Sequence, residues 1–169
     1  MNRLKIVSSQ FMVEENSLKV LVVYDTSSVN RNTEKVAKTV GEVLKEKGFD
    51  VDCLYVKDVD AATVKDYDCV LAGSPTHAFR ATGSIMKFLS GYSQDEFSGK
   101  LGAAFDTQMQ GRITGNAAKG IEKGLNKLGF RMVMPPLMTY VEGKLESVQL
   151  KAGELEKVRK YAEDLAKAL

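Results

Sequence analysis

A chain of 169 residues is long enough for one globular domain with a substantial hydrophobic core. Lysine and arginine outnumber aspartate and glutamate only by 24 to 22, so the sequence lacks the basic excess typical of nucleic-acid-binding proteins. No apolar stretch could cross a membrane and no apolar signal core opens the chain, so we expect a cytoplasmic protein. One histidine and two cysteines do not make a zinc site, and Cys53 and Cys69 are expected to be buried thiols in strands.

Residues 1–17 precede the first recognisable core strand. They carry β-type residues at 4–7 and 11–13, and a polar run separates these from the rest of the chain. We interpret 1–17 as an N-terminal extension, either a strand on a sheet edge or an arm that packs on a partner. An upstream start codon, with Met12 as the alternative start, is a further reading. Residues 18–169 are predicted to form the single domain.

Residues 19–40 contain a strand, a polar loop and the start of a helix. The run Lys19–Tyr24 is rich in β-branched residues, which is typical of a buried parallel strand. Residues 25–33 are rich in hydroxyl and amide side chains, and apolar residues recur at helical spacing after Glu34. Unpaired first-turn amides and the helix dipole attract anions, so this loop predicts an anion site. The alternative is that Asn32 or Thr33 only caps the helix.

Strands and helices alternate along the rest of the chain. Pro135 and Pro136 interrupt the last strand, which is predicted to resume at a sheet edge, where proline is tolerated. Such alternation gives a parallel sheet with helices on both faces. The predicted strands cover 50–56, 68–73, 101–105 and 131–141, and the predicted helices cover 34–47, 84–92, 116–128 and 154–169.

Long polar loops follow three of these strands, at residues 25–33, 74–83 and 106–114. Ligands of parallel α/β sheets bind at the carboxyl ends of the strands, near the point where the strand order reverses. The three loops are therefore predicted to build one site.

The same loops resemble those that bind flavin in the flavodoxin superfamily. Tyr24–Thr26 followed by Thr33–Ala37 is similar to the phosphate loop of flavodoxins and of the flavodoxin domain of flavodiiron proteins, but the intervening stretch is longer and lacks the usual glycine. Gly73–Thr76 resembles the second loop, and Ala104–Thr107 with Gly115–Lys119 resembles the third. The resemblance implies an α/β doubly wound three-layer sandwich, a five-stranded parallel sheet of order 2-1-3-4-5, and a bound FMN.

The resemblance also assigns roles to the three loops. Hydroxyls and amides of 26–33 would hold the FMN phosphate, Phe79 or His77 would stack on the ring, and 74–77 and 106–109 would reach the pyrimidine edge. Arg80 and Arg112 are candidates to raise the flavin potential. Alternatively, His77 is a solvent-exposed loop residue, Phe79 a core plug, and Arg112 a solvated charge or a capping group. The expected FMN-binding residues are Thr26, Ser27, Ser28, Asn30, Asn32, Thr33, Ser74, Pro75, Thr76, His77, Phe79, Asp106, Thr107, Gln108, Met109 and Gly111.

The expected function is FMN-dependent electron transfer with redox partner proteins. The sequence offers no pair of residues for acid–base or nucleophilic catalysis and no metal cluster, so we assign no catalytic residue and no metal site. Two alternatives stay open: an FMN-dependent NAD(P)H:quinone-type oxidoreductase, and a flavodoxin-like interaction module that has lost FMN. Both a monomer and a homodimer are compatible with the sequence.

Overall fold

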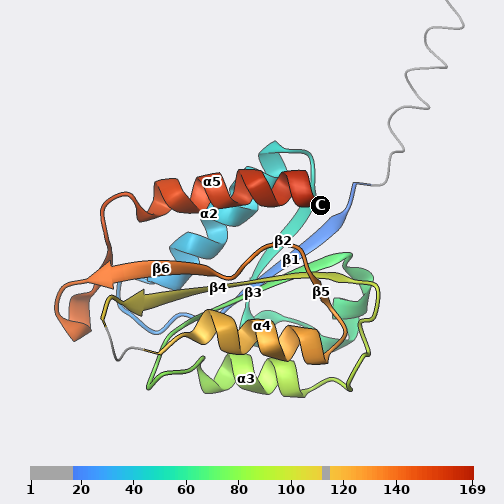
Figure 1. Cartoon of the computed structure of the whole chain (residues 1–169), viewed down its shortest axis with the longest axis horizontal. Coiled ribbons are helices and arrows are strands. Elements are labelled where there is room, and N and C mark those ends of the chain that lie inside the picture. Colours follow the sequence, from blue (N-terminus) through green and yellow to red (C-terminus); the bar gives the residue numbers. More distant parts are fainter. Residues whose placement is uncertain (1–16, 112–114) are drawn as a thin grey trace, which may run out of the picture.

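The computed structural model describes residues 17–111 and 115–169 (Figure 1). The expectations for residues 1–16 and for Arg112 lie outside these ranges. The strands are β1 (Lys19–Tyr24), β2 (Asp50–Tyr55), β3 (Cys69–Pro75), β4 (Leu101–Met109), β5 (Arg131–Met132), β6 (Leu137–Glu142) and β7 (Gln149–Leu150). The helices are α2 (Asn32–Glu46), α3 (Gly83–Ser90), α4 (Ala117–Lys127) and α5 (Glu154–Ala168), and the 3₁₀ turns are η2 (Val56–Asp58), η3 (Ala61–Asp66) and η4 (Leu145–Ser147).

The strand order confirms the predicted doubly wound topology. β1 lies between β2 and β3, and β4 follows β3, with all of these pairs parallel. The fifth position is shared by β5 and β6, which both pair in parallel with β4 because Pro135 and Pro136 break the strand between them. The sheet is not purely parallel, since the short strand β7 adds an antiparallel edge to β6.

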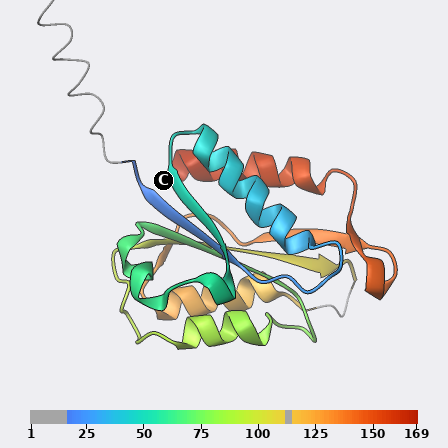
Figure 2. The same cartoon turned by 180° about the vertical axis from the view of Figure 1, so that it is seen from behind.

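Helices cover both faces of the sheet (Figures 1 and 2). Alternate residues of a strand point to opposite faces, and β1 shows this clearly. Val20 and Val22 join the core under α2 and α5, whereas Leu21 and Val23 join the core under α3 and α4. Each face of β1 is therefore buried, which explains why its sequence is apolar without alternation.

The crossover from β2 to β3 contains no α-helix. It consists of η2 and η3, and their buried residues Val56 and Val64 pack into the core on the α3 side. Among the helices of the described ranges, none is long and apolar enough to cross a membrane.

Candidate functional site

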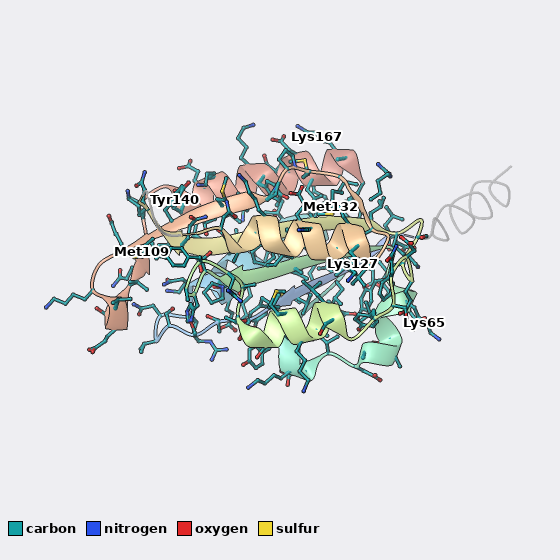
Figure 3. All side chains as sticks on the ribbon, turned by 60° about the horizontal axis from the view of Figure 1, so that its bottom comes forward. Lys65, Met109, Lys127, Met132, Tyr140 and Lys167 are labelled. Atoms are coloured by element: carbon teal, nitrogen blue, oxygen red, sulfur yellow. The ribbon has the colours of Figure 1, made fainter. Side chains whose placement is uncertain are left out.

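The three polar loops meet at the carboxyl edge of the sheet, as the strand order requires. They surround a cavity of about 240 Å³. Met109 lies at this end of the molecule and Lys127 at the opposite end (Figure 3). Of the residues expected from the sequence, those that line the cavity are Ser27, Ser28, Asn32, Pro75, Thr76, His77, Thr107, Gln108 and Met109.

The first loop forms a tight turn before helix α2. The Arg31 N–H donates to the Ser28 carbonyl at 2.9 Å, and Arg31 has left-handed backbone angles with φ of 50°. This turn lets the helix begin at Asn32, two residues earlier than Glu34. Arg31 occupies the N-cap position without a side-chain capping bond, so the alternative that Asn32 or Thr33 only caps the helix is wrong.

Two asparagines of the first loop bind a distant segment. The Asn30 side-chain amide donates to the carbonyls of Ser147 and Val148 at 3.2 and 3.0 Å, and the Asn32 amide donates to Val148 at 2.8 Å. These bonds fasten the first loop to the segment around η4. The segment contributes Leu145 and Val148 to the wall of the cavity.

Sequence reasoning missed this wall. Val141, at the end of β6, lines the cavity together with Leu145 and Val148, and these last two belong to a connection that shows no polar motif. The only signal for it was the presence of two apolar residues within the polar stretch 142–149.

The threonines of the first loop differ in their hydrogen bonding. The Thr26 hydroxyl oxygen is buried and has no partner, whereas the Thr33 hydroxyl is 2.8 Å from the hydroxyl of Thr107. The buried Asp25 carboxylate accepts bonds from the Thr26 N–H at 2.8 Å and from the Thr82 hydroxyl at 2.5 Å. One hydroxyl of this loop is therefore ready for a further partner, which is unusual for a buried polar atom.

A glutamate in the first turn of α2 is balanced by two cations. Glu34 forms ion pairs with Arg31 and Lys38, and its carboxylate also accepts a bond from the Tyr24 hydroxyl. The hydrogen bond from Arg31, with further bonds from Lys38 and Tyr24, lowers the pKa of Glu34 to about 2. The carboxylate therefore stays ionised and paired near the anion-attracting end of the helix.

The second loop contains a strained turn. His77 and Arg80 exchange two backbone hydrogen bonds at 2.8 and 3.0 Å, and the residues between them, Ala78 and Phe79, have φ of 43° and 73°. Phe79 is 58% exposed, so it is not a core plug. His77 reaches across to the first loop, where its Nε2 lies 2.8 Å from the Ser27 hydroxyl.

The third loop holds a fully buried acid. Asp106 is 0% exposed and accepts bonds from the side chains of Gln108 and Thr76 and from the Ala118 N–H. Burial raises the pKa of Asp106, and these bonds partly oppose that rise. Ser74 is also fully buried, where its hydroxyl accepts from the Thr82 N–H at 2.9 Å.

Several expected residues therefore lie outside the cavity lining. Their side chains are buried behind the loops, bonded to other segments, or placed at the rim. These residues are Thr26, Asn30, Thr33, Ser74, Phe79, Asp106 and Gly111.

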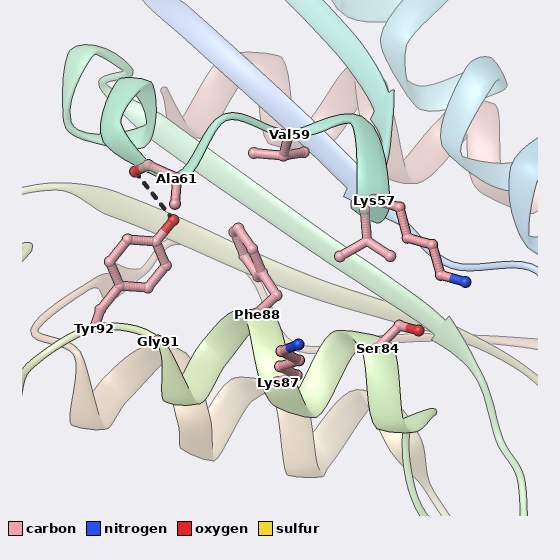
Figure 4. A pocket seen from close by; sticks show the side chains of 9 residues that line it. Lys57, Val59, Ala61, Ser84, Lys87, Phe88, Gly91 and Tyr92 are labelled. Carbon is pink, nitrogen blue, oxygen red and sulfur yellow. Dashed lines mark hydrogen bonds between the residues drawn. The ribbon is translucent and has the colours of Figure 1, made fainter.

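A second, larger cavity lies away from the three loops. Its volume is about 550 Å³, and it runs along α3, between this helix and the η2–η3 crossover (Figure 4). Val59 on the crossover and Phe88 on α3 give it apolar walls, and the Tyr92 hydroxyl donates to the Ala61 carbonyl at 3.3 Å. The absence of an α-helix in this crossover leaves the groove open.

The described residues contain no metal-binding cluster. No group of three or more histidine, cysteine, aspartate or glutamate side chains converges within the described ranges. Cys69 is buried as expected, whereas Cys53 is only half-buried, and both are free. Burial raises the pKa of Cys53 to about 11 and that of Cys69 to about 12, so both stay protonated thiols at neutral pH.

Comparison with protein families gives one match over most of the chain. The family model described as "Flavodoxin domain" matches residues 21–167. A flavodoxin of Clostridium saccharobutylicum is 31% identical over 91 residues, which are 53% of this chain and 56% of that protein. An uncharacterized protein of Methanocaldococcus jannaschii is 27% identical over 156 residues, which are 87% of this chain but 36% of that protein. The chain thus covers less than two thirds of the length of these relatives.

Solved structures with the same fold include free-standing flavodoxins and a larger enzyme. Oxidised Flavodoxin 1 from Bacillus cereus superposes with a TM-score of 0.73 at 18% identity, over 89% of this chain and 99% of that one. Rubredoxin oxygen:oxidoreductase from Desulfovibrio gigas gives 0.71 at 22% identity, over 96% of this chain and 39% of that one. At these identities the likeness establishes the fold alone.

Proposed function

The chain belongs to the flavodoxin family, and from that premise we propose that residues 18–169 bind FMN non-covalently and exchange electrons with partner proteins. The observation that carries the proposal is the cavity at the carboxyl edge of the sheet, which all three loops line. Polar side chains of the first loop line it together with apolar side chains such as Met109 and Leu145. This combination suits a ligand with a charged phosphate and a flat apolar ring.

The first loop has the free groups that a phosphate needs. The Thr26 hydroxyl is buried without a partner, and the N-terminus of α2 has no side-chain cap at Arg31. First-turn amides and a free hydroxyl are suitable donors for an anion. We assign the phosphate to Thr26, Ser27, Ser28 and Thr33, together with the backbone N–H groups of the first loop.

The asparagines of this loop receive a different role in the proposal. Their side-chain NH₂ groups are occupied by the carbonyls of Ser147 and Val148, and the Asn32 amide oxygen, which is buried without a partner, can only accept. Asn30 and Asn32 would therefore shape the loop, and they would serve the ligand through their backbone.

The remaining loops would hold the ring. Pro75, His77 and Met109 would contact its faces, with the exposed Phe79 at the rim. Thr76 and Gln108 would contact its polar edge. Ser74 and Asp106 would support these residues from behind, Thr107 would line the cavity beside them, and Gly111 continues the third loop. When bound, the flavin supplies the electron chemistry, and the chain supplies position and electrostatics. We keep the expected cytoplasmic location as part of this proposal.

A binding titration tests the proposed function. Flavin fluorescence is followed while apo-protein is added to FMN, and quenching at micromolar protein is expected. Thr26→Val should weaken FMN by about tenfold, because one hydrogen bond to a charged group is worth about 1.5–3 kcal/mol. Thr39→Val, on the exposed side of α2, is the control and should bind FMN as the wild type does. Absence of quenching by the wild type would contradict the proposal.

Neither alternative has a specific observation in its favour among the described residues. A quinone reductase would need a substrate site beside the flavin, and an interaction module would need no free donors in the first loop. We therefore propose electron transfer alone.

A further inference from the structure

The buried carboxylate of Asp106 is hydrogen-bonded to a side chain that lines the cavity between the three loops. Asp106 and Gln108 are two residues apart in β4, so both point to the face covered by α4. The Gln108 Nε2 lies 3.1 Å from each oxygen of the Asp106 carboxylate. Gln108 lines the cavity, whereas Asp106 is 0% exposed behind it.

Hydrogen bonds to the Asp106 carboxylate favour its ionised form and partly offset the burial, which raises the pKa of this carboxyl. The Ala118 N–H, in the first turn of α4, donates to the carboxylate at 3.0 Å, and the Thr76 hydroxyl approaches the same oxygen at 3.3 Å. The N-terminal end of a helix stabilises negative charge. An ionised carboxylate can only accept hydrogen bonds, so it fixes which end of the Gln108 amide faces it.

The cavity edge is consequently lined by acceptors. The NH₂ group of Gln108 is committed to Asp106, which leaves the amide oxygen to face a ligand. The Thr76 hydroxyl donates to Asp106 and accepts from the Ala117 N–H at 3.0 Å, so it too has no donor to spare. An edge of this kind selects a ligand group that donates.

We propose that Asp106 is a positioning residue that holds the Gln108 amide oxygen towards the cavity, where it accepts a hydrogen bond from the N3–H of the flavin pyrimidine ring. This inference rests on the proposed function. N3–H is the one N–H group of the oxidised ring system, and the other polar atoms of that ring accept hydrogen bonds. Asp106 therefore sets which edge of the ring enters the cavity.

The variant Asp106→Asn removes the negative charge of this side chain and keeps its shape. Asparagine has nearly the same size, but its amide can donate as well as accept. The NH₂ group that this substitution introduces can pair with the Gln108 oxygen, and Gln108 then turns its own NH₂ group to the cavity. A donor would face the N3–H donor, and the hydrogen bond would be lost.

A double-mutant cycle in FMN affinity measures this coupling. Asp106→Asn and Gln108→Met are each expected to weaken FMN by about tenfold, which corresponds to one hydrogen bond of about 1.4 kcal/mol. The double variant should bind no more weakly than Gln108→Met alone, because Asp106 acts through Gln108. Asp58→Asn, an exposed carboxylate at the end of η2, is the charge-matched control and should leave FMN affinity unchanged.

A second readout needs no flavin. In the ¹H–¹⁵N spectrum of the apo-protein, the Gln108 side-chain NH₂ signals should be protected from exchange and should shift as Asp106 titrates. Both properties should disappear in Asp106→Asn. If this variant fails to fold by circular dichroism, the wild-type NMR titration and Gln108→Met decide the question.

The outcomes separate the two proposals. Wild-type affinity for FMN in Asp106→Asn or in Gln108→Met would overturn the inference while leaving the proposed function intact. So would an effect of Asp106→Asn that persists fully in the Gln108→Met background. Failure of the wild type to bind FMN would overturn the proposed function and the N3–H contact together, and the apo spectrum would then still report whether Asp106 orients Gln108.

Discussion

Residues Ala78 and Phe79 show how much a single turn is strained at this site. Both have positive φ, as in the type I′ turns that favour asparagine and glycine. Left-handed angles cost residues other than glycine roughly 1–2 kcal/mol, and such strain tends to gather at functional sites. The turn holds the exposed Phe79 side chain next to His77, which lines the cavity. We therefore expect the strained turn to position Phe79.

Replacing Ala78 should relieve part of this strain. Asparagine adopts left-handed angles more readily than alanine, so Ala78→Asn should raise the free energy of unfolding by about 0.5–1 kcal/mol. Urea unfolding measures the change. Arg80→Asn, in the same turn but without positive φ, is the control and should change stability little. Equal effects of the two variants would contradict the strain argument.

At the scale of elements, Gly115 allows the second loop and the start of α4 to touch. A Cβ atom on Gly115 would lie 2.1 Å from the Phe79 Cα, and the φ of Gly115 is 71°. Phe79 and Gly115 also form an isolated parallel bridge. The close approach of these two backbones places the turn of the second loop against the third.

The variant Gly115→Ala should therefore push the second loop away from the start of α4. We expect the free energy of unfolding to fall by about 2 kcal/mol or more, through the steric clash and the positive φ together. Gly120→Ala is the matched control, because nothing lies within 4 Å of a Cβ there, and alanine should stabilise α4 by about 0.5–1 kcal/mol. Chemical denaturation of both variants tests the contrast, and opposite signs are the expected result.

The same elements show what the sequence could predict. β1 and the strand order followed from an apolar run and from strand–helix alternation, because burial of both sheet faces leaves a clear pattern. The break at Pro135 and Pro136 followed from the missing amide hydrogens. The bonds from Asn30 and Asn32 to Ser147 and Val148 could not be predicted from the sequence. They join two segments that are far apart in the chain, and their acceptors are backbone carbonyls, which every residue has.

For the whole molecule, the ion pairs of Glu34 make stability depend on pH. Hydrogen bonding from Arg31, then from Lys38 and Tyr24, lowers the pKa of this carboxyl from 4.5 to about 2 in the folded protein. The unfolded chain binds the proton more readily. The stabilisation is therefore present above pH 4.5 and is lost as the pH falls towards 2.

Glu34→Gln should remove this dependence. At neutral pH the wild type should be more stable than the variant, and the difference in the free energy of unfolding should shrink as the pH falls from 4.5 towards 2. Glu46, an exposed partner of Arg159, provides the control. The difference in the free energy of unfolding between the wild type and Glu46→Gln should stay nearly constant with pH. Urea unfolding at several pH values checks both. A constant gap for Glu34→Gln would contradict the assigned pKa.

Exposed apolar side chains gather at the cavity edge of the sheet, among polar ones. Four of the six exposed large apolar side chains in the described ranges lie at this edge, two of them on loops, one at the end of β4 and one in η4, whereas Met86 and Leu155 lie on helices. Such a rim suits a short-lived contact with a partner protein. Its members are Val29, which is 83% exposed, Phe79 at 58%, Met109 at 38% and Leu145 at 88%.

If the chain exchanges electrons with partner proteins as proposed, its net charge of only +2 predicts docking through this rim more than through long-range attraction. The rate of electron transfer to a basic and to an acidic acceptor protein should each change by less than about tenfold between low and high salt, because electrostatic steering needs a larger charge.

Leu145→Ser should slow both rates by about the same factor, since it removes apolar contact area. Leu155→Ser, on α5, is the matched control and should leave both electron-transfer rates unchanged. Stopped-flow spectroscopy of the reduced FMN complex measures these rates. Steep salt dependences of opposite sign for the two acceptors would show that charge, not the rim, selects the partner.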